Sequence, residues 1–173
     1  EQLGGGFRLG FKLDDWQTVT TKYNIVHRNV QATDTASIAI QEMDGSSLKS
    51  ALSLGYIYDN LDNPINPANG YRLQANSELA GIGGDVRYLS GELAGYYFHP
   101  LFYEGLTMKV KGTAGQITGW GGDEPQVLDL FFKGGDSFRG FEPAGIGPRQ
   151  LNPNSGKNDS VGGQTYAIGS AEV

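Results

Sequence analysis

Histidine is the side chain that most readily supports acid–base or metal chemistry, and this chain has only two of them. His27 and His99 lie on different segments, and there is no cysteine. A metal centre needs several clustered ligands, and a Ser-His-Asp arrangement needs partners that orient the histidine. The sequence offers neither, so we expect no enzymatic activity, no metal site and no cofactor.

Acidic side chains in one long connection are the next candidates for ligand chemistry. They lack the Asp-x-Asp-x-Asp-Gly spacing of a calcium loop, so we expect them to be solvated loop charges: Asp123, Glu124, Asp129 and Asp136. In the same connection, Gly134 and Gly135 have no Walker-type lysine pattern around them, so phosphate binding is not predicted.

The composition excludes further classes. The chain has 173 residues with a formal net charge of −6, and it lacks the clustered basic residues that neutralise nucleic-acid phosphates. No run of apolar residues is long enough for a transmembrane helix, and mean hydropathy is −0.36. Alternating transmembrane strands remain possible, because alternation hides their hydrophobicity. With no initiating Met, no signal peptide and a last strand cut in mid-course, the sequence is interpreted as a fragment.

A two-residue alternation of apolar and polar side chains recurs along the chain and predicts strands. In the first strand, Phe7, Leu9 and Phe11 oppose Arg8 and Lys12. We expect about seven strands: 7–13, 16–29, 48–59, 71–79, 89–97, 106–114 and one from 162 onward. Turns are predicted at 14–15, 60–70, 81–84 and 99–100, a loop with one helical turn at 30–49, and the longest loop at about 119–161.

The alternation fits two all-β architectures, a soluble sandwich or a membrane barrel. The strands are long, short and long connections alternate, and the presumed inner face carries charges that suit a water-filled lumen: Arg8, Lys12, Lys22, Arg72, Glu78, Glu92, Lys109 and Lys111. Aromatic residues at strand ends suit a membrane interface: Trp16, Tyr58, Tyr71, Tyr97 and Phe98. These features favour a partial antiparallel transmembrane β-barrel, and a sandwich remains the alternative.

Two motifs in series resemble those of the BamA-type outer-membrane assembly factors. The first occupies the longest loop, and we call its residues the latch motif: Gly134, Gly135, Asp136, Phe138, Arg139, Gly140 and Phe141. Ile146-Gly147-Pro148-Arg149 follows it, as in the family. The second motif is the next strand, which starts at Gly162-Gly163 and carries Glu172 in a Ser-x-Glu triplet. By this resemblance, residues 1–173 correspond to about strands six to twelve of a sixteen-stranded barrel, with the periplasmic POTRA domains and the last strands outside it.

The resemblance implies that the longest loop folds back into the barrel and that Arg139 meets Glu172 on the inner wall. The residues agree, because Glu172 shares a strand face with Tyr166 and Ser170, opposite the small residues Ala167 and Ala171. A bidentate arginine–carboxylate pair would supply directional hydrogen bonds. The glycines would allow close approach to the wall, and Phe138 and Phe141 could pack beside the pair.

The resemblance also implies a function without catalysis: folding and inserting β-barrel proteins into the outer membrane of a Gram-negative bacterium. The implied partners are the lipid bilayer, unfolded outer-membrane protein clients and accessory assembly lipoproteins. Two alternatives stay open, namely a two-partner-secretion-type polypeptide transporter, which shares the arginine loop, and a passive porin-like channel. A porin would not explain the latch motif.

Overall fold

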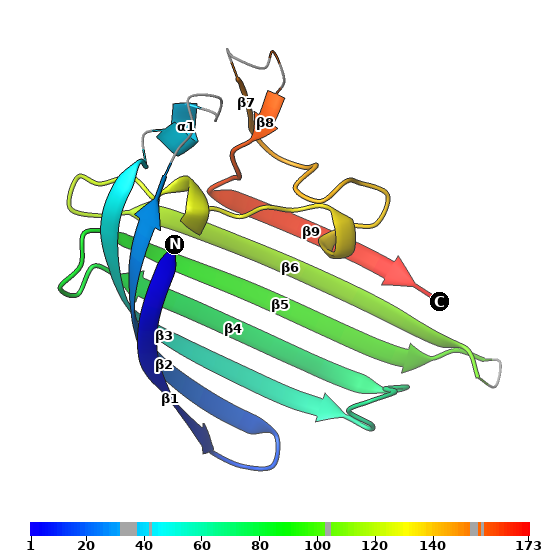
Figure 1. Cartoon of the computed structure of the whole chain (residues 1–173). Helices are drawn as coiled ribbons and strands as arrows, with labels where there is room; N and C mark the ends of the chain where they lie inside the picture. Colours follow the sequence, from blue (N-terminus) through cyan, green and yellow to red (C-terminus); the bar gives the residue numbers. More distant parts are fainter. Residues whose placement is uncertain (32–37, 42, 103–104, 153–155, 157) are drawn as a thin grey trace.

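The computed structural model describes residues 1–31, 38–41, 43–102, 105–152, 156 and 158–173. Its main body is one curved antiparallel sheet with strand order β1-β2-β3-β4-β5-β6-β9 (Figure 1). The strand bounds are β1 Gln2–Lys12, β2 Gln17–Val30, β3 Gly45–Leu61, β4 Gly70–Ala80, β5 Tyr88–Pro100, β6 Thr107–Gly119 and β9 Thr165–Glu172. The sheet has seven strands, which confirms the all-β antiparallel prediction.

The connections divide between the two ends of the sheet. Short turns join β1 to β2, β3 to β4 and β5 to β6 at one end of the sheet. At the opposite end, the β2–β3 and β6–β9 connections are longer, while β4 joins β5 through the short connection 81–87 (Figure 1). The helical turn α1, Ile38–Gln41, lies in the predicted loop at 30–49, of which residues 32–37 and 42 lie outside the described residues. No helix in the described part of the chain has the length and apolar character to cross a membrane.

Three local predictions are corrected by the structure. β3 begins at Gly45, because Gly45 to Lys49 pair with Val30 to Val26 of β2. β5 continues through the predicted turn at His99 and Pro100, which pair with Met108 and Thr107. The loop predicted to be without strands contains the short hairpin β7 Arg149–Leu151 and β8 Asn158–Ser160, in addition to the 3-10 turns η1 Val127–Asp129 and η2 Gly135–Ser137.

The two faces of the sheet differ in character, as the alternation predicts. One face exposes large apolar side chains on successive strands: Phe7, Leu9, Phe11, Leu54, Leu73, Leu93 and Val110 are all at least 40% exposed. Such a continuous apolar surface is typical of a lipid or protein contact. We call the opposite face the inner face. Its small buried core contains Ala51, Ala80, Val86, Tyr88 and Ile117.

The turn between β3 and β4 is organised by one carboxylate. Asp62 Oδ1 accepts hydrogen bonds from the backbone amides of Asn63, at 2.8 Å, and Ala68, at 3.0 Å. Hydrogen bonding to backbone amides, that of Asn69 foremost, lowers the pKa of the Asp62 carboxyl below its ordinary value.

A pH dependence of this turn follows from the lowered pKa. The stabilisation is complete above the ordinary aspartate pKa of about 3.9 and is lost as pH falls through the lower folded value. We expect the amide resonances of Asn63 and Ala68 to shift together, with a midpoint below that ordinary value, in a pH titration followed by NMR. The Asp62→Asn variant should show no such titration, and a midpoint at or above the ordinary value would contradict the assignment.

Candidate functional site

We call the segment between β6 and β9, residues 120–164, the inner segment. Its first part, with η1 and η2, lies over the inner face, and the β7–β8 hairpin projects beyond the end of the sheet (Figure 1). The start of the inner segment is fixed to the end of the sheet by Trp120, whose indole Nε1 donates a 2.9 Å hydrogen bond to the carbonyl of Ala80. The Arg87 guanidinium lies 5.8 Å from the Trp120 ring centroid and pairs with Asp123 at 3.7 Å. These contacts direct the chain inward rather than away from the sheet.

Hydrophobic packing holds the next part of the inner segment. Leu130 and Phe131, which directly follow η1, pack against the buried core of the inner face. Phe131 and Gly163 exchange two backbone hydrogen bonds, of 3.0 and 2.9 Å. The part of the segment that follows η1 therefore lies beside the part that leads into β9. A Cβ at Gly162 would lie 2.9 Å from the Cβ of Leu130, so a larger residue at position 162 would clash with Leu130.

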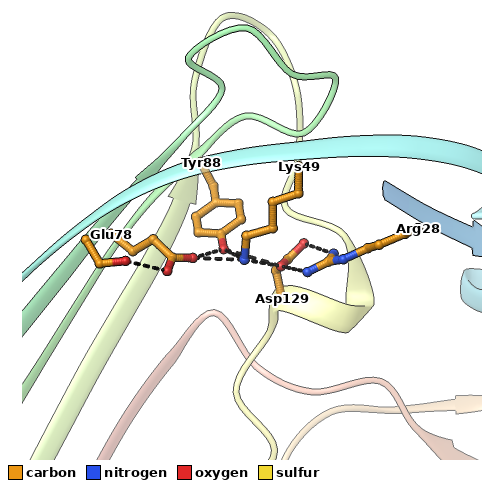
Figure 2. Close-up of polar contacts among 6 residues, drawn as sticks. Arg28, Lys49, Glu78, Tyr88 and Asp129 are labelled. Carbon is orange, nitrogen blue, oxygen red and sulfur yellow. Dashed lines mark hydrogen bonds and ion pairs between the residues drawn. The ribbon is translucent and has the colours of Figure 1, made fainter. Parts of the chain in front are cut away.

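We call the sheet strands on which the inner segment lies the wall. Asp129, the last residue of η1, places its carboxylate between two cationic side chains of this wall (Figure 2). Arg28 of β2 donates to both carboxylate oxygens, at 2.9 and 3.0 Å, in the bidentate geometry that suits a guanidinium. Lys49 Nζ of β3 lies 3.0 Å from Asp129 Oδ1. The Asp129 side chain is 1% exposed, so these partners replace nearly all of its water contacts.

The network extends from Asp129 across the wall to β4 and β5, as Figure 2 shows. Lys49 also pairs with Glu78 at 2.8 Å, and Ser53 donates to the same carboxylate at 2.9 Å. The Tyr88 hydroxyl hydrogen bonds to Lys49 and Glu78. We call Arg28, Lys49, Glu78, Tyr88 and Asp129 the buried charge cluster. Its two cations and two carboxylates balance, so their mutual attraction and hydrogen bonds offset the desolvation cost of burying them.

The expectation that Asp129 is a solvated loop charge is wrong. Asp129 is flanked by Leu128 and Leu130, whereas Asp123 and Glu124 lie in a polar, glycine-rich stretch. The two flanking leucines are the local signal that could have identified Asp129 as buried. Asp123 is 44% exposed but paired with Arg87, and Asp136 is exposed as predicted. Tyr88 was missed because it lies one residue before the predicted strand 89–97, and Lys49, although inside the predicted strand 48–59, was not assigned to either face.

A second contact joins the inner segment to β5 and β9. Lys133 Nζ lies 3.7 Å from the Tyr166 ring centroid and 3.9 Å from Glu92 Oε2. The Tyr166 hydroxyl donates to the same Glu92 carboxylate, and its ring packs edge-on against Phe131. A cation over an aromatic face with a carboxylate alongside is a favourable, directional arrangement.

The latch motif forms a compact turn directly after Lys133. Gly135 N donates to Phe141 O at 2.9 Å, and the Ser137 hydroxyl hydrogen bonds to the backbone of Gly134, so the ends of the motif are held together. The Phe138 and Phe141 rings lie 5.4 Å apart. Asp136 lies in η2, and Gly140 has a positive φ of 91°.

The structure brings Arg139 and Glu172 together, at the outer limit of an ion pair. Arg139 Nη1 lies 4.0 Å from Glu172 Oε1, and the Arg139 side chain is 88% exposed. Lys109 of β6 is closer to the same carboxylate, at 3.4 Å. Glu172 therefore has two cationic neighbours, and the contact to Arg139 is neither bidentate nor buried.

The inner face also contains a cavity of about 490 Å³. Its polar lining combines residues that the alternation assigned to the inner face with members of the buried charge cluster: Arg8, Lys22, Arg28, Lys49, Glu78, Glu92 and Asp129. Within the described ranges, no group of three or more His, Asp or Glu side chains could hold a metal ion. The contacts described above hold the inner segment against the inner face of the sheet.

Comparisons with known proteins agree with this architecture. The Omp85 superfamily domain matches residues 1–173. The outer membrane protein assembly factor BamA of Neorickettsia risticii is 28% identical over 172 residues, which are 99% of this chain and 22% of that protein. The sorting and assembly machinery component 50 homolog of Homo sapiens is 30% identical over 168 residues, 95% of this chain and 34% of that protein. The chain thus spans about a fifth to a third of these relatives.

A solved structure shows the same fold. The crystal structure of BamA from Haemophilus ducreyi lacking POTRA domains 1–3 superposes with a TM-score of 0.82 at 22% sequence identity. The match covers 98% of this chain and 36% of that one. The sheet described above therefore resembles part of a BamA barrel.

Proposed function

This chain belongs to the Omp85 superfamily, and from that premise we propose that it forms part of a barrel that assembles β-barrel proteins into an outer membrane. The observation that carries the proposal is the combination of an apolar outer face with a long segment held on the polar inner face. A passive pore requires an apolar outer face, but it does not require a segment of its own chain inside the pore. The names of both relatives describe assembly.

The proposed partners follow from the surfaces and the family. The apolar outer face would contact the lipid bilayer, and unfolded β-barrel proteins would be the clients. Accessory assembly lipoproteins belong to the same proposal. No chemical step is required, because burial of a client's apolar residues in lipid supplies the driving force, and client strands can pair by addition to a sheet edge.

We propose a Gram-negative outer membrane as the location, with the mitochondrial outer membrane as the alternative that the second relative raises. The alignment with bacterial BamA extends over nearly the whole chain, and the bacterial crystal structure has the same fold. The experiment expresses the full-length protein that contains this chain in bacteria depleted of BamA and, separately, in yeast depleted of Sam50. Restored insertion of outer-membrane proteins in bacteria alone supports the proposal, and rescue in yeast alone overturns the bacterial location.

Two other outcomes bear on the function itself. Export of a polypeptide without restored insertion would favour a secretion transporter. Large, steady conductance in planar bilayers that is unaffected by loss of Arg139 would favour a porin-like channel. Either result would overturn the assembly proposal.

Within this function we propose that the latch motif and Glu172 hold the far part of the inner segment. The support is the Arg139–Glu172 approach and the closed turn of residues 134–141. Exposed ion pairs contribute about 0–1 kcal/mol. We therefore expect Arg139→Ala or Glu172→Ala to increase opening of this part by no more than about fivefold, as measured by hydrogen exchange of residues 134–141, and to lower assembly activity.

Arg149→Ala is the matched control for the latch proposal. Arg149 is an exposed arginine of the same segment, and its guanidinium donates a hydrogen bond to the carbonyl of Gly145 at 3.3 Å. This variant should leave hydrogen exchange in residues 134–141 unchanged. Unaltered exchange, heat-modifiable mobility and growth in both the Arg139 and Glu172 variants would show that the pair does not hold the segment.

A further inference from the structure

We propose that Asp129 is the positioning residue that anchors the inner segment to the wall of the barrel. Its carboxylate joins the segment to β2 through Arg28 and to β3 through Lys49, while the Arg139 contact to β9 is secondary. The proposal rests on these contacts and on the fold, and it does not depend on the assembly function.

Burial is the first argument for this anchor. The Asp129 side chain is 1% exposed and that of Arg28 is 10% exposed, whereas the Arg139 side chain is 88% exposed. Water and salt screen an exposed pair, but they barely reach a buried one. Removing one partner of a buried pair leaves an uncompensated charge, so the loss is far greater than for an exposed pair.

Charge balance is the second argument. The wall residues of the cluster comprise the two cations Arg28 and Lys49 and the single carboxylate Glu78, so without Asp129 the cluster has a net positive charge. Asp129 brings the balancing charge when the inner segment is in place. The positive charges of Arg28 and Lys49 therefore favour an acidic residue at this position.

Position along the chain is the third argument. Asp129 precedes Leu130 and Phe131, which pack on the core, and Phe131 pairs with Gly163 where the inner segment returns to the sheet. An anchor at this crossing holds the base of the whole segment. Lys133 and the latch motif come directly after it, so their placement depends on the base being fixed.

Cleavage at Lys133 by a lysine-specific protease measures opening of the inner segment. The Lys133 side chain is 21% exposed and lies against Tyr166 and Glu92, so cleavage there requires the segment to leave the wall. When reclosing is fast, the cleavage rate follows the population of the open form. The assay uses the full-length protein in detergent or lipid, with products identified by mass spectrometry.

Asp129→Asn keeps the shape of the side chain and removes its charge. We expect the initial cleavage rate at Lys133 to rise at least about tenfold, because a buried ion pair is broken. Glu124→Gln is the matched control, since Glu124 is an exposed acid of the same segment that lies outside the latch motif, and its rate should stay within about twofold of the parent. An Asp129→Asn rate within twofold of the parent would overturn the proposal.

A double-mutant cycle separates anchoring from a general loss of structure. Arg28→Gln alone should also accelerate cleavage, and adding it to Asp129→Asn should produce little further change, because the two residues form one interaction. Additive effects would overturn the pairing. If Asp129→Asn does not yield a heat-modifiable barrel, the Arg28→Gln variant alone tests the proposal. That variant keeps the ion pair between Lys49 and Asp129, so it is expected to fold. No acceleration in that variant would then overturn the anchor. Because cleavage reports the segment and not client insertion, failure here leaves the assembly proposal standing.

Discussion

Replacing Lys49 with methionine is expected to lower the free energy of unfolding by about 3–5 kcal/mol, the range found when one partner of a buried ion pair is removed. Lys49 is 8% exposed and lies between the two carboxylates of the buried charge cluster, 2.8 Å from Glu78 and 3.0 Å from Asp129. Methionine retains the volume of the stem but no charge. Glu78 then loses its ion pair with Lys49, and Asp129 retains its pair with Arg28.

Denaturant unfolding of the protein in lipid or detergent, followed by heat-modifiable mobility, measures this loss. Lys22→Met is the matched control, because Lys22 is an exposed lysine of the same sheet face, and it should change stability by less than about 1 kcal/mol. Adding Glu78→Gln to Lys49→Met should recover part of the loss, since it removes the carboxylate left without a cation. Equal losses in Lys49→Met and Lys22→Met would contradict the importance of the cluster.

The strands and their two faces could be predicted from the sequence because both depend on local alternation. Phe7, Leu9 and Phe11 were assigned to one face of their strand, and all three are exposed on the apolar side. Glu172 was assigned to the opposite face of its strand from Ala171, and it does approach groups of the inner face. Strand ends were less predictable, since the pairing of His99 and Pro100 depends on the partner strand.

The buried charge cluster could not be predicted in this way. The Arg28–Asp129 hydrogen bonds join residues 101 positions apart, and the Lys49–Asp129 bond joins residues 80 positions apart. Alternation shows which face a strand residue occupies, but not which loop residue will cover it. The acidic residues of the loop were treated alike, although Asp129 lies between two leucines and is buried by its tertiary contacts, whereas Asp136 is exposed.

The approach of Arg139 to Glu172 illustrates a different source of information. It was expected from the resemblance of two motifs, not from the spacing of the residues themselves. The structure brings the two side chains to 4.0 Å without burying the arginine. The resemblance suggested which residues could pair, whereas the strength of such a contact depends on burial that no motif encodes.

Gly134→Ala is expected to disrupt the latch motif and the seating of the inner segment after Lys133. Gly134 has φ 129° and ψ −179°, a region that essentially only glycine occupies, at a cost of about 1–3 kcal/mol for other residues. A Cβ there would lie 2.1 Å from the carbonyl oxygen of Glu142. Because this neighbour is backbone, it cannot rotate away, and η2 would have to shift.

Gly140→Ala separates backbone strain from steric clash in this prediction. Gly140 also has a positive φ, of 91°, but a Cβ there meets nothing within 4 Å. Hydrogen exchange at the Gly135 and Ser137 amides, whose acceptors are Phe141 and residue 134, measures closure of the turn. We expect exchange at both amides to rise at least about tenfold more in Gly134→Ala than in Gly140→Ala. Equal exchange in the two variants would mean that the close approach to Glu142 does not determine how the latch motif closes.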